Sequence, residues 1–270
     1  MLKITVVQPD YYVGEQPDEK NAAYLIEQLE KVTPGELIVL PEYSNAGGLS
    51  DPEAERAALP RAKEMLAVAS RIAAARKACV SINVLEERQG EIKNSTYLFD
   101  TWGQVAFIYD KQHLPPSEVD LGVVPGGGAG YGCVCDLDGI RFAFMTCYDV
   151  YFNEQIEWIA ARKPDVILVP GYQRGERVDM IRAQMKLLAF RCNATVARAS
   201  FSMRSEEKGG CSMIVAPDGQ ILVDIGSGVG CVSAEIDPSW KYLRPAGFGG
   251  KMVRNDDFIN HGLRRKDLGE

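Results

Sequence analysis

Histidine is scarce in this chain of 270 residues, which contains only His113 and His261. A nucleophile activated by histidine would have to use one of these two side chains. A carboxylate or a lysine is therefore the expected base for any hydrolytic reaction. The same scarcity argues against a zinc site, because zinc is held mainly by cysteine and histidine side chains. We expect no bound metal ion.

Long apolar runs are also missing, since no stretch approaches the roughly 20 residues that span a bilayer. The N-terminal segment Met1–Gln8 has the pattern of a strand, with neither a basic leader nor a small-residue cleavage site. The 30 Lys and Arg residues are outnumbered by 37 Asp and Glu residues, which gives a net charge of −7. Because nucleic-acid binding needs a basic face, we expect neither a nucleic-acid nor a membrane partner.

The seven cysteines are odd in number and scattered along the chain. This usage is typical of reduced thiols in a cytoplasmic protein and not of a secreted disulfide framework. A chain of this length can bury a full core as one large α/β domain, and no linker or shift in composition marks a boundary. We predict a single domain over residues 1–270, in which 240–270 form a C-terminal extension with little regular pattern.

Strand and helix patterns alternate along the chain. Short apolar runs rich in β-branched residues predict strands, and apolar residues at helical spacing predict helices. The expected strands are 2–9, 36–40, 79–86, 94–100, 104–109, 132–137, 140–146, 165–169, 194–200, 211–216, 220–225 and 230–236. The expected helices are 18–32, 60–78, 153–162 and 176–192, and a Gly/Pro-rich loop is expected over 114–130. This mixture predicts an α/β fold, and a strand–helix–strand repeat around 36–42 and 165–171 indicates two similar sheets packed together.

Three polar side chains follow predicted strands, where α/β proteins tend to place functional groups. Glu42 follows the strand 36–40 and could be desolvated enough to act as a base. Lys111 follows the strand 104–109, and beside a thiol it would favour the thiolate and stabilise an oxyanion. Cys147 lies in a strand–turn–helix segment that would also lower the pKa of its thiol. Taken singly, each has an ordinary interpretation as a solvated acid, a surface lysine or a buried thiol. Together they supply a base, a cation and a nucleophile.

At these residues the sequence resembles the nitrilase superfamily of carbon–nitrogen hydrolases. The resemblance covers about residues 1–240, and its matching segments are Ile38–Glu42, Tyr109–Leu114 and Thr146–Asp149, with Asn94 and Gly126. It implies a four-layer α/β/β/α sandwich of two mixed sheets, subunits that dimerise through this sandwich, and catalysis without a cofactor.

The resemblance also implies the roles of individual residues. Cys147 would attack a carbonyl carbon, and Glu42 would take the thiol proton and later activate water. Lys111 and the backbone N–H of Tyr148 would hold the oxyanion. Glu118 matches the second glutamate of the family, although the sequence alone also allows a surface acid in a loop. The reaction would pass through a thioester acyl-enzyme.

Three positions depart from the usual family residues. Tyr151 and Asn153, or Val150 in another register, stand where an arginine and a proline commonly follow the nucleophile, and Arg191 stands where an acid is usual. These changes leave the four implied catalytic residues in place, and they leave the subfamily open.

The segment after the predicted strand 165–169 offers candidate substrate-binding residues. Tyr172 could pack against an apolar or aromatic group. Arg174 or Arg177 could bind a substrate carboxylate, or both could pair with neighbouring acids. The glycines at 126–128 lack the lysine and serine of a phosphate-binding loop, so a flexible loop near the site is expected there.

These observations predict a cytoplasmic amidase that forms a homodimer and hydrolyses a small linear amide to an acid and ammonia. An N-carbamoyl hydrolase, a nitrilase and an acyltransferase that shares the thioester remain open. A non-catalytic binding protein of the same fold remains open as well.

Overall fold

The computed structural model describes residues 1–127 and 132–260. The strands are β1 Leu2–Gln8, β2 Glu36–Val39, β3 Cys79–Arg88, β4 Glu91–Phe99, β5 Val105–Asp110, β6 Val134–Leu137, β7 Ile140–Phe144, β8 Val166–Pro170, β9 Thr195–Ala199, β10 Met213–Val215, β11 Ile221–Asp224, β12 Gly230–Ile236, β13 Leu243–Pro245 and β14 Met252–Arg254. The helices are α1 Pro17–Leu29, α2 Pro52–Ala57, α3 Leu59–Arg76, α4 Pro116–Leu121, α5 Asn153–Ala161, α6 Val178–Cys192 and α7 Asn255–Asn260, with a 3-10 helix at Cys147–Tyr151.

Twelve of the strands form two six-stranded mixed sheets, in the orders β12-β1-β2-β3-β4-β5 and β11-β10-β9-β8-β7-β6. Strands β1, β2 and β3 are parallel in the first sheet, and β7, β8 and β9 are parallel in the second. Antiparallel strands flank both parallel centres. The two sheets therefore share one design, as the repeat around 36–42 and 165–171 predicts.

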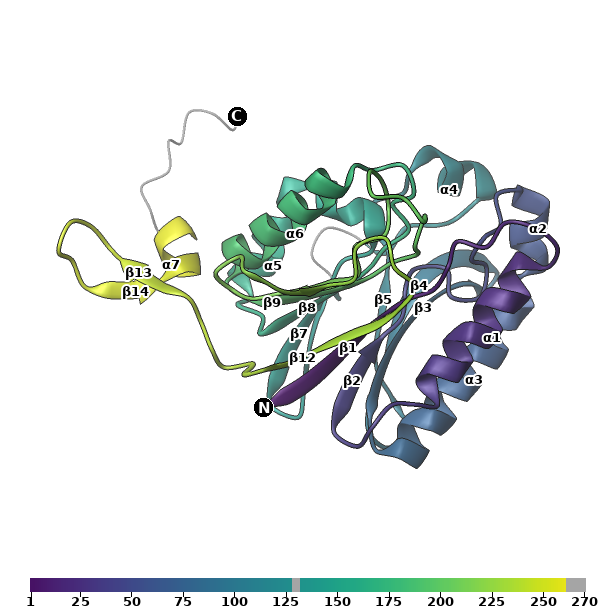
Figure 1. Ribbon diagram of the computed structural model, residues 1–270, viewed down its shortest axis with the longest axis horizontal. Coiled ribbons are helices and arrows are strands. Elements are labelled where there is room, and N and C mark those ends of the chain that lie inside the picture. The colour runs from purple at the N-terminus through teal and green to yellow at the C-terminus, as the bar shows by residue number, and fades with distance from the viewer. Residues whose placement is uncertain (128–131, 261–270) are drawn as a thin grey trace.

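The sheets pack face to face, with α1 and α3 covering one outer face and α5 and α6 the other (Figure 1). The alternation of side chains along β2 shows how the layers form. Leu37 and Val39 belong to the core between the sheets, whereas Ile38 belongs to the core under α1 and α3. The prediction of an α/β/β/α sandwich of two mixed sheets is confirmed.

Two short helices before the C-terminal extension were not predicted. Helix α2 begins after Asp51, whose carboxylate accepts a hydrogen bond from the Ala54 N–H at 3.0 Å. Helix α4 lies inside the segment 114–130, which we expected to be a loop throughout. Each helix has six residues, which is too few for a helical period to show in the sequence.

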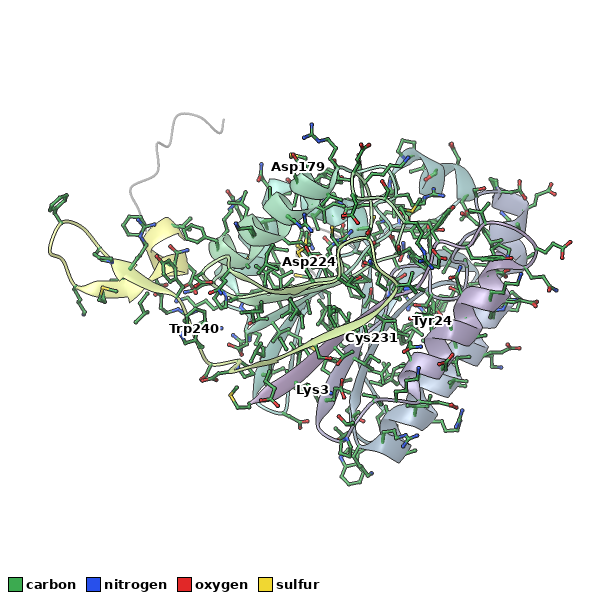
Figure 2. All side chains as sticks on the ribbon, viewed as in Figure 1. Lys3, Tyr24, Asp179, Asp224, Cys231 and Trp240 are labelled. Atoms are coloured by element: carbon green, nitrogen blue, oxygen red, sulfur yellow. The ribbon has the colours of Figure 1, made fainter. Side chains whose placement is uncertain are left out.

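The C-terminal extension has more regular structure than its sequence pattern suggests. Strands β13 and β14 form a hairpin, and α7 follows directly. Asn193 at the end of α6 donates to Asp256 at 2.8 Å, and Asn255 donates to the Phe190 carbonyl at 2.6 Å, so α7 is fixed to α6. Figure 2 shows Trp240 where the chain passes from β12 to this arm.

Within the described residues, no helix has the length and apolarity to cross a membrane. His261 and Gly128, both considered in the sequence analysis, lie outside the described residues.

Candidate active site

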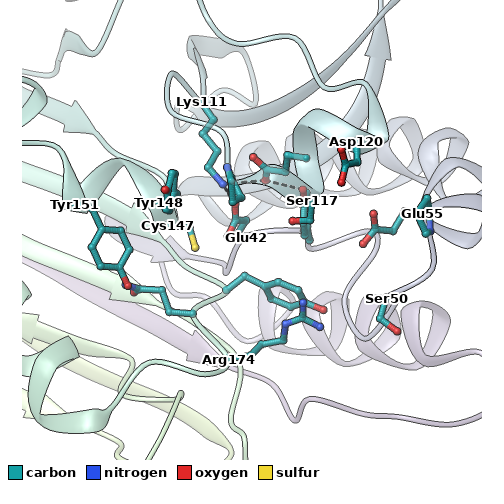
Figure 3. A pocket seen from close by; sticks show the side chains of 16 residues that line it. Glu42, Ser50, Glu55, Lys111, Ser117, Asp120, Cys147, Tyr148, Tyr151 and Arg174 are labelled. Carbon is teal, nitrogen blue, oxygen red and sulfur yellow. Dashed lines mark hydrogen bonds and ion pairs between the residues drawn. The ribbon is translucent and has the colours of Figure 1, made fainter.

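Three chain segments bring the predicted residues to one place (Figure 3). Glu42 follows β2 and Lys111 directly follows β5, both in the first sheet. Cys147 begins the 3-10 helix that follows β7 in the second sheet. The site is therefore built from the strand ends of both sheets, and the packing of the two sheets fixes its geometry.

Lys111 is the centre of this site. Its side chain is almost fully buried, and its Nζ donates to Oε1 of Glu42 and to Oε1 of Glu118, both at 2.8 Å. Burial lowers the pKa of the Lys111 ammonium, but the two carboxylates outweigh burial and hold its pKa above the ordinary value. Lys111 is therefore a fixed positive charge between two acids.

Glu118 lies on α4 and is only 4% exposed, so it is not the surface acid that the sequence alone allowed. Its Oε1 also accepts hydrogen bonds from the Tyr43 hydroxyl at 2.6 Å and from Asn94 at 2.9 Å. Its Oε2 is buried and has no hydrogen-bond partner among the described residues. Burial and the nearby Glu42 raise the pKa of Glu118, while Lys111 opposes them.

The Cys147 thiol and the Glu42 carboxylate line the same cavity, and Glu42 affects the pKa of the thiol. Lys111 lowers the pKa of this thiol, as expected, but the net shift is in the opposite direction. Burial, followed by the charge of Glu42, raises its pKa well above the ordinary value and outweighs Lys111. Cys147 is consequently a neutral thiol at rest, and it would act as a nucleophile only after a base takes its proton.

The turn that carries Cys147 is held in an unusual conformation. Cys147 has φ of 47°, in the left-handed region that non-glycine residues rarely adopt. Thr146 and Asp149 form a capping box around it, in which the Thr146 N–H donates to Asp149 at 2.8 Å. Backbone strain of this kind persists only where surrounding bonds enforce it. Asp149 therefore holds the turn that positions Cys147.

A cavity of about 430 Å³ opens above these residues. Glu42, Lys111, Glu118 and Cys147 line it, and its remaining walls come from the loops after β2 and β8 and from α2, α4 and the 3-10 helix. This volume is within the usual range for small-molecule sites.

The sequence profile of the carbon–nitrogen hydrolase family matches residues 3–244. The chain belongs to this family. It is 27% identical to a 2-oxoglutaramate amidase of Bacillus subtilis over 161 residues, which is 58% of this chain but only 61% of that protein. It is also 30% identical over 203 residues to a Pseudomonas protegens protein described as a hydrolase in the pqqF 5′ region, covering 73% of this chain and 70% of the relative.

Solved structures of related folds agree with this assignment. An amidase mutant from Nesterenkonia sp. AN1, in which acrylamide has added to the active-site cysteine, superposes with a TM-score of 0.74 at 20% identity and covers 88% of this chain and 94% of its own. A carbon–nitrogen hydrolase from Helicobacter pylori gives a TM-score of 0.71 at 18% identity, covering 88% and 89%. At these identities the likeness shows the fold, and the fold is that of the nitrilase superfamily.

Two predicted substrate-binding residues of this carbon–nitrogen hydrolase line the cavity. The Tyr172 hydroxyl accepts a hydrogen bond from the Gly48 N–H at 2.9 Å, which fixes its ring. The Arg174 guanidinium lies 4.8 Å from the centre of that ring and donates to the Tyr11 hydroxyl at 2.6 Å. Tyr148, whose backbone N–H was predicted to bind the oxyanion, also lines the cavity.

Arg177, the other candidate for binding a carboxylate, does not line this cavity. Its side chain is exposed and forms an ion pair with Asp179 at 2.6 Å. The alternative interpretation, in which an arginine of this segment pairs with a neighbouring acid, therefore describes Arg177 and not Arg174.

Sequence reasoning noted Asn94 only as a position that matches the family, and it missed Asn83, which together with Asn94 holds Glu42 in place. Asn83 accepts a hydrogen bond from the Tyr43 N–H at 2.8 Å and donates to Asn94 at 2.7 Å, and Asn94 in turn donates to Glu42 at 2.8 Å. Asn83 is fully buried in β3. A polar side chain in an apolar strand is the signal that could have found it, because buried amides need partners.

His113 has a positioning role and lies outside the group around Lys111. Its Nδ1 and its backbone N–H both contact Asp149 Oδ1 at 2.9 Å. Its ring stacks on Phe152, with ring centres 3.8 Å apart. In residues 1–127 and 132–260, no three His, Cys, Asp or Glu side chains are grouped so as to hold a metal ion.

Proposed function

We propose that this carbon–nitrogen hydrolase cleaves a small linear amide to an acid and ammonia through a thioester on Cys147. One observation carries the proposal. Lys111 is fixed at 2.8 Å from both Glu42 and Glu118, and all three line, together with Cys147, one cavity that is large enough for a small molecule.

The neutral thiol defines the first half of the reaction. As the Cys147 sulfur attacks the carbonyl carbon, Glu42 accepts the thiol proton. The charge that develops on the carbonyl oxygen is stabilised by the Lys111 ammonium and by the backbone N–H of Tyr148. Glu118 Oε2, which lacks a protein donor, accepts a hydrogen bond from the amide nitrogen. Glu42 then returns the proton to the nitrogen, the carbon–nitrogen bond breaks, and ammonia leaves.

The second half repeats this chemistry with water. Glu42 takes a proton from water, the hydroxide attacks the thioester carbon, and the carbon–sulfur bond breaks. The proton held by Glu42 passes to the Cys147 sulfur, so the thiol is restored and the acid is released. One glutamate thus serves as base and acid in turn, and no cofactor is required by these steps.

Arg174 is the residue we propose for recognition of a substrate carboxylate. It supplies a cation inside the cavity, on a ring that Gly48 holds in place. The name of the Bacillus relative, a 2-oxoglutaramate amidase, is consistent with such a substrate because that amide carries a carboxylate. The cytoplasmic location and the homodimer stay predictions.

Intact-protein mass spectrometry tests the mechanism. The protein is exposed briefly to small amides, N-carbamoyl compounds and nitriles, then quenched in acid, with ammonia measured in parallel. We expect an acyl adduct and ammonia release with amides, and neither in Cys147→Ala. Cys231→Ala removes an exposed thiol elsewhere and serves as the matched control.

The outcome separates the alternatives. If adducts form only from carbamoyl compounds or only from nitriles, that class of compound and not an amide is the substrate. Turnover that persists in Cys147→Ala would refute the thioester. Binding of amides without any turnover would support a non-catalytic member of the fold.

A further inference from the structure

The outer part of the cavity is formed by four polar residues on the two short helices and the loop before α2. Glu55 lies on α2, Ser117 and Asp120 lie on α4, and Ser50 precedes α2. In Figure 3 these side chains lie together on the side of the cavity away from Tyr151. This outer wall is distinct from the catalytic group around Lys111, and the steps proposed above do not use it.

The carboxylates of this wall have no protein donors. Among the described residues, the side chains of Glu55 and Asp120 take part in no hydrogen bond and no ion pair. The same cavity is lined by Glu118, which is 4% exposed and whose Oε2 is also without a partner. Asp120 is exposed to solvent, but Glu55 is half-buried in the cavity without a protein donor, which indicates that its donor comes from a ligand.

The four residues of the outer wall include two carboxylates and no cation, so the wall is negatively charged. Burial raises the pKa of Glu55, and Glu118 raises it further, while Arg174 lowers it. Arg174 is already bonded to Tyr11 and lies beyond ion-pair distance from Glu55. A half-buried carboxylate without a paired cation is costly, and a bound cation would remove that cost.

Resting on the proposed amide hydrolysis, we propose that the outer wall binds an ammonium group at the far end of the substrate. Glu55 is the main partner of this ammonium, and Asp120 lies beside it. The substrate class is accordingly short amides that carry a primary ammonium group at the end opposite the amide to be cleaved.

Four amides built on the same butanamide chain, with or without an ammonium and a carboxylate at its far end, test this proposal. L-Glutamine carries an ammonium and a carboxylate, 4-aminobutanamide carries only the ammonium, glutaramate only the carboxylate, and butanamide neither. We expect kcat/KM for 4-aminobutanamide to exceed that for butanamide about 10–100-fold, which is the usual effect of a hydrogen bond to a charged group. L-Glutamine should exceed glutaramate by a similar factor.

Glu55→Gln should reduce both ratios toward one, since the amide retains the size of the carboxylate but not its charge. Glu53→Gln is the matched control, because Glu53 is an exposed acid on the same helix that does not line the cavity. Its two ratios should equal those of the unchanged protein. Equal reductions for all four amides in Glu55→Gln would show a structural role and overturn the proposal.

Calorimetric titration of Cys147→Ala with the same four amides makes the result independent of turnover. Tighter binding of 4-aminobutanamide than of butanamide, lost on adding Glu55→Gln, would support the ammonium site even if no amide were hydrolysed. Turnover without an ammonium preference would overturn the ammonium site and leave amide hydrolysis standing. If neither amine-bearing amide binds, the ammonium site is overturned as well.

Discussion

Replacing Lys111 by methionine tests whether the catalytic group is a network of buried charges. Lys111 is 2% exposed and donates to both Glu42 and Glu118 at 2.8 Å. Methionine has similar length but no charge, so the two carboxylates would remain buried without a counter-ion. Removing one partner of a buried ion pair costs about 3–5 kcal/mol, a large share of the roughly 5–15 kcal/mol that stabilises a protein domain. We expect the free energy of unfolding to fall by about that amount at pH 7.5.

The loss should depend on pH in a definite direction. Without the lysine, the pKa of Glu118, already raised by burial and by Glu42, rises further above its unfolded value of about 4.3. A group whose folded pKa is raised contributes stability below the unfolded pKa, and this contribution disappears as pH rises through the folded pKa. The deficit of Lys111→Met relative to the unchanged protein should therefore be smallest near pH 4.5 and grow toward pH 7.5.

Urea unfolding followed by tryptophan fluorescence measures this deficit between pH 4.5 and 8. The double variant Lys111→Met/Glu118→Gln removes one of the two stranded charges, so it should recover part of the lost stability. It should not recover amide turnover, because a missing oxyanion donor costs about 10²–10³ in kcat. A deficit below about 1 kcal/mol, or one that does not change with pH, would refute the picture of two ionised carboxylates held by one lysine.

Two further perturbations address substrate recognition and the turn that carries the nucleophile. Arg174→Met should raise KM for glutaramate about tenfold or more and change KM for butanamide little. Arg177→Met is the control and should leave both KM values unchanged. Equal KM values for glutaramate in the two variants would exclude the contact between Arg174 and the substrate carboxylate. The hydrogen bond to Asp149 raises the pKa of His113 above its ordinary value near 6.5, despite the opposing effect of burial. The protein has two histidines, so an NMR titration should show one raised histidine pKa, and that pKa should fall in Asp149→Asn. The unchanged protein should also lose stability as pH rises through the raised pKa of His113, because the folded state still holds a proton that the unfolded chain has given up. An Asp149→Asn titration identical to that of the unchanged protein would contradict this contact.

The layered fold was predictable because its signals are local. The apolar run at 36–40 and the run at 165–169 predict buried strands, and each forms the centre of a sheet. The helix predicted over 60–78 buries Met65, Ala69 and Ile72, which are positions of the predicted apolar face. In these segments a continuous apolar run, or apolar residues spaced at 3.6 residues, is enough to identify the element.

The arrangement of the site depended on contacts between segments far apart in the chain. Glu42, Lys111 and Cys147 were recognisable as polar groups after strands, and the structure brings them together. The sign of the Cys147 pKa shift was not predictable in this way, because it depends on how deeply the thiol is buried and on the charge of Glu42. Asn83 became visible as a supporting residue only when β3 and β4 were paired.

The features that were missed lie mainly on the two short helices of the cavity wall, whereas Tyr172 and Arg174 of the same cavity were predicted. Glu42, Lys111 and Cys147 follow strands of the two sheets, and the pairing of those strands fixes their positions. Glu55, Glu118 and Asp120 lie on six-residue helices that have no periodic signal, and Glu118 was found only through the resemblance. Because α2 and α4 form one wall of the cavity and belong to neither sheet, their residues can change without disturbing the strands that hold Glu42 and Lys111. Substitutions on the exposed and half-exposed positions of these two helices should therefore alter which amide is cleaved while leaving the chemistry at Cys147 intact.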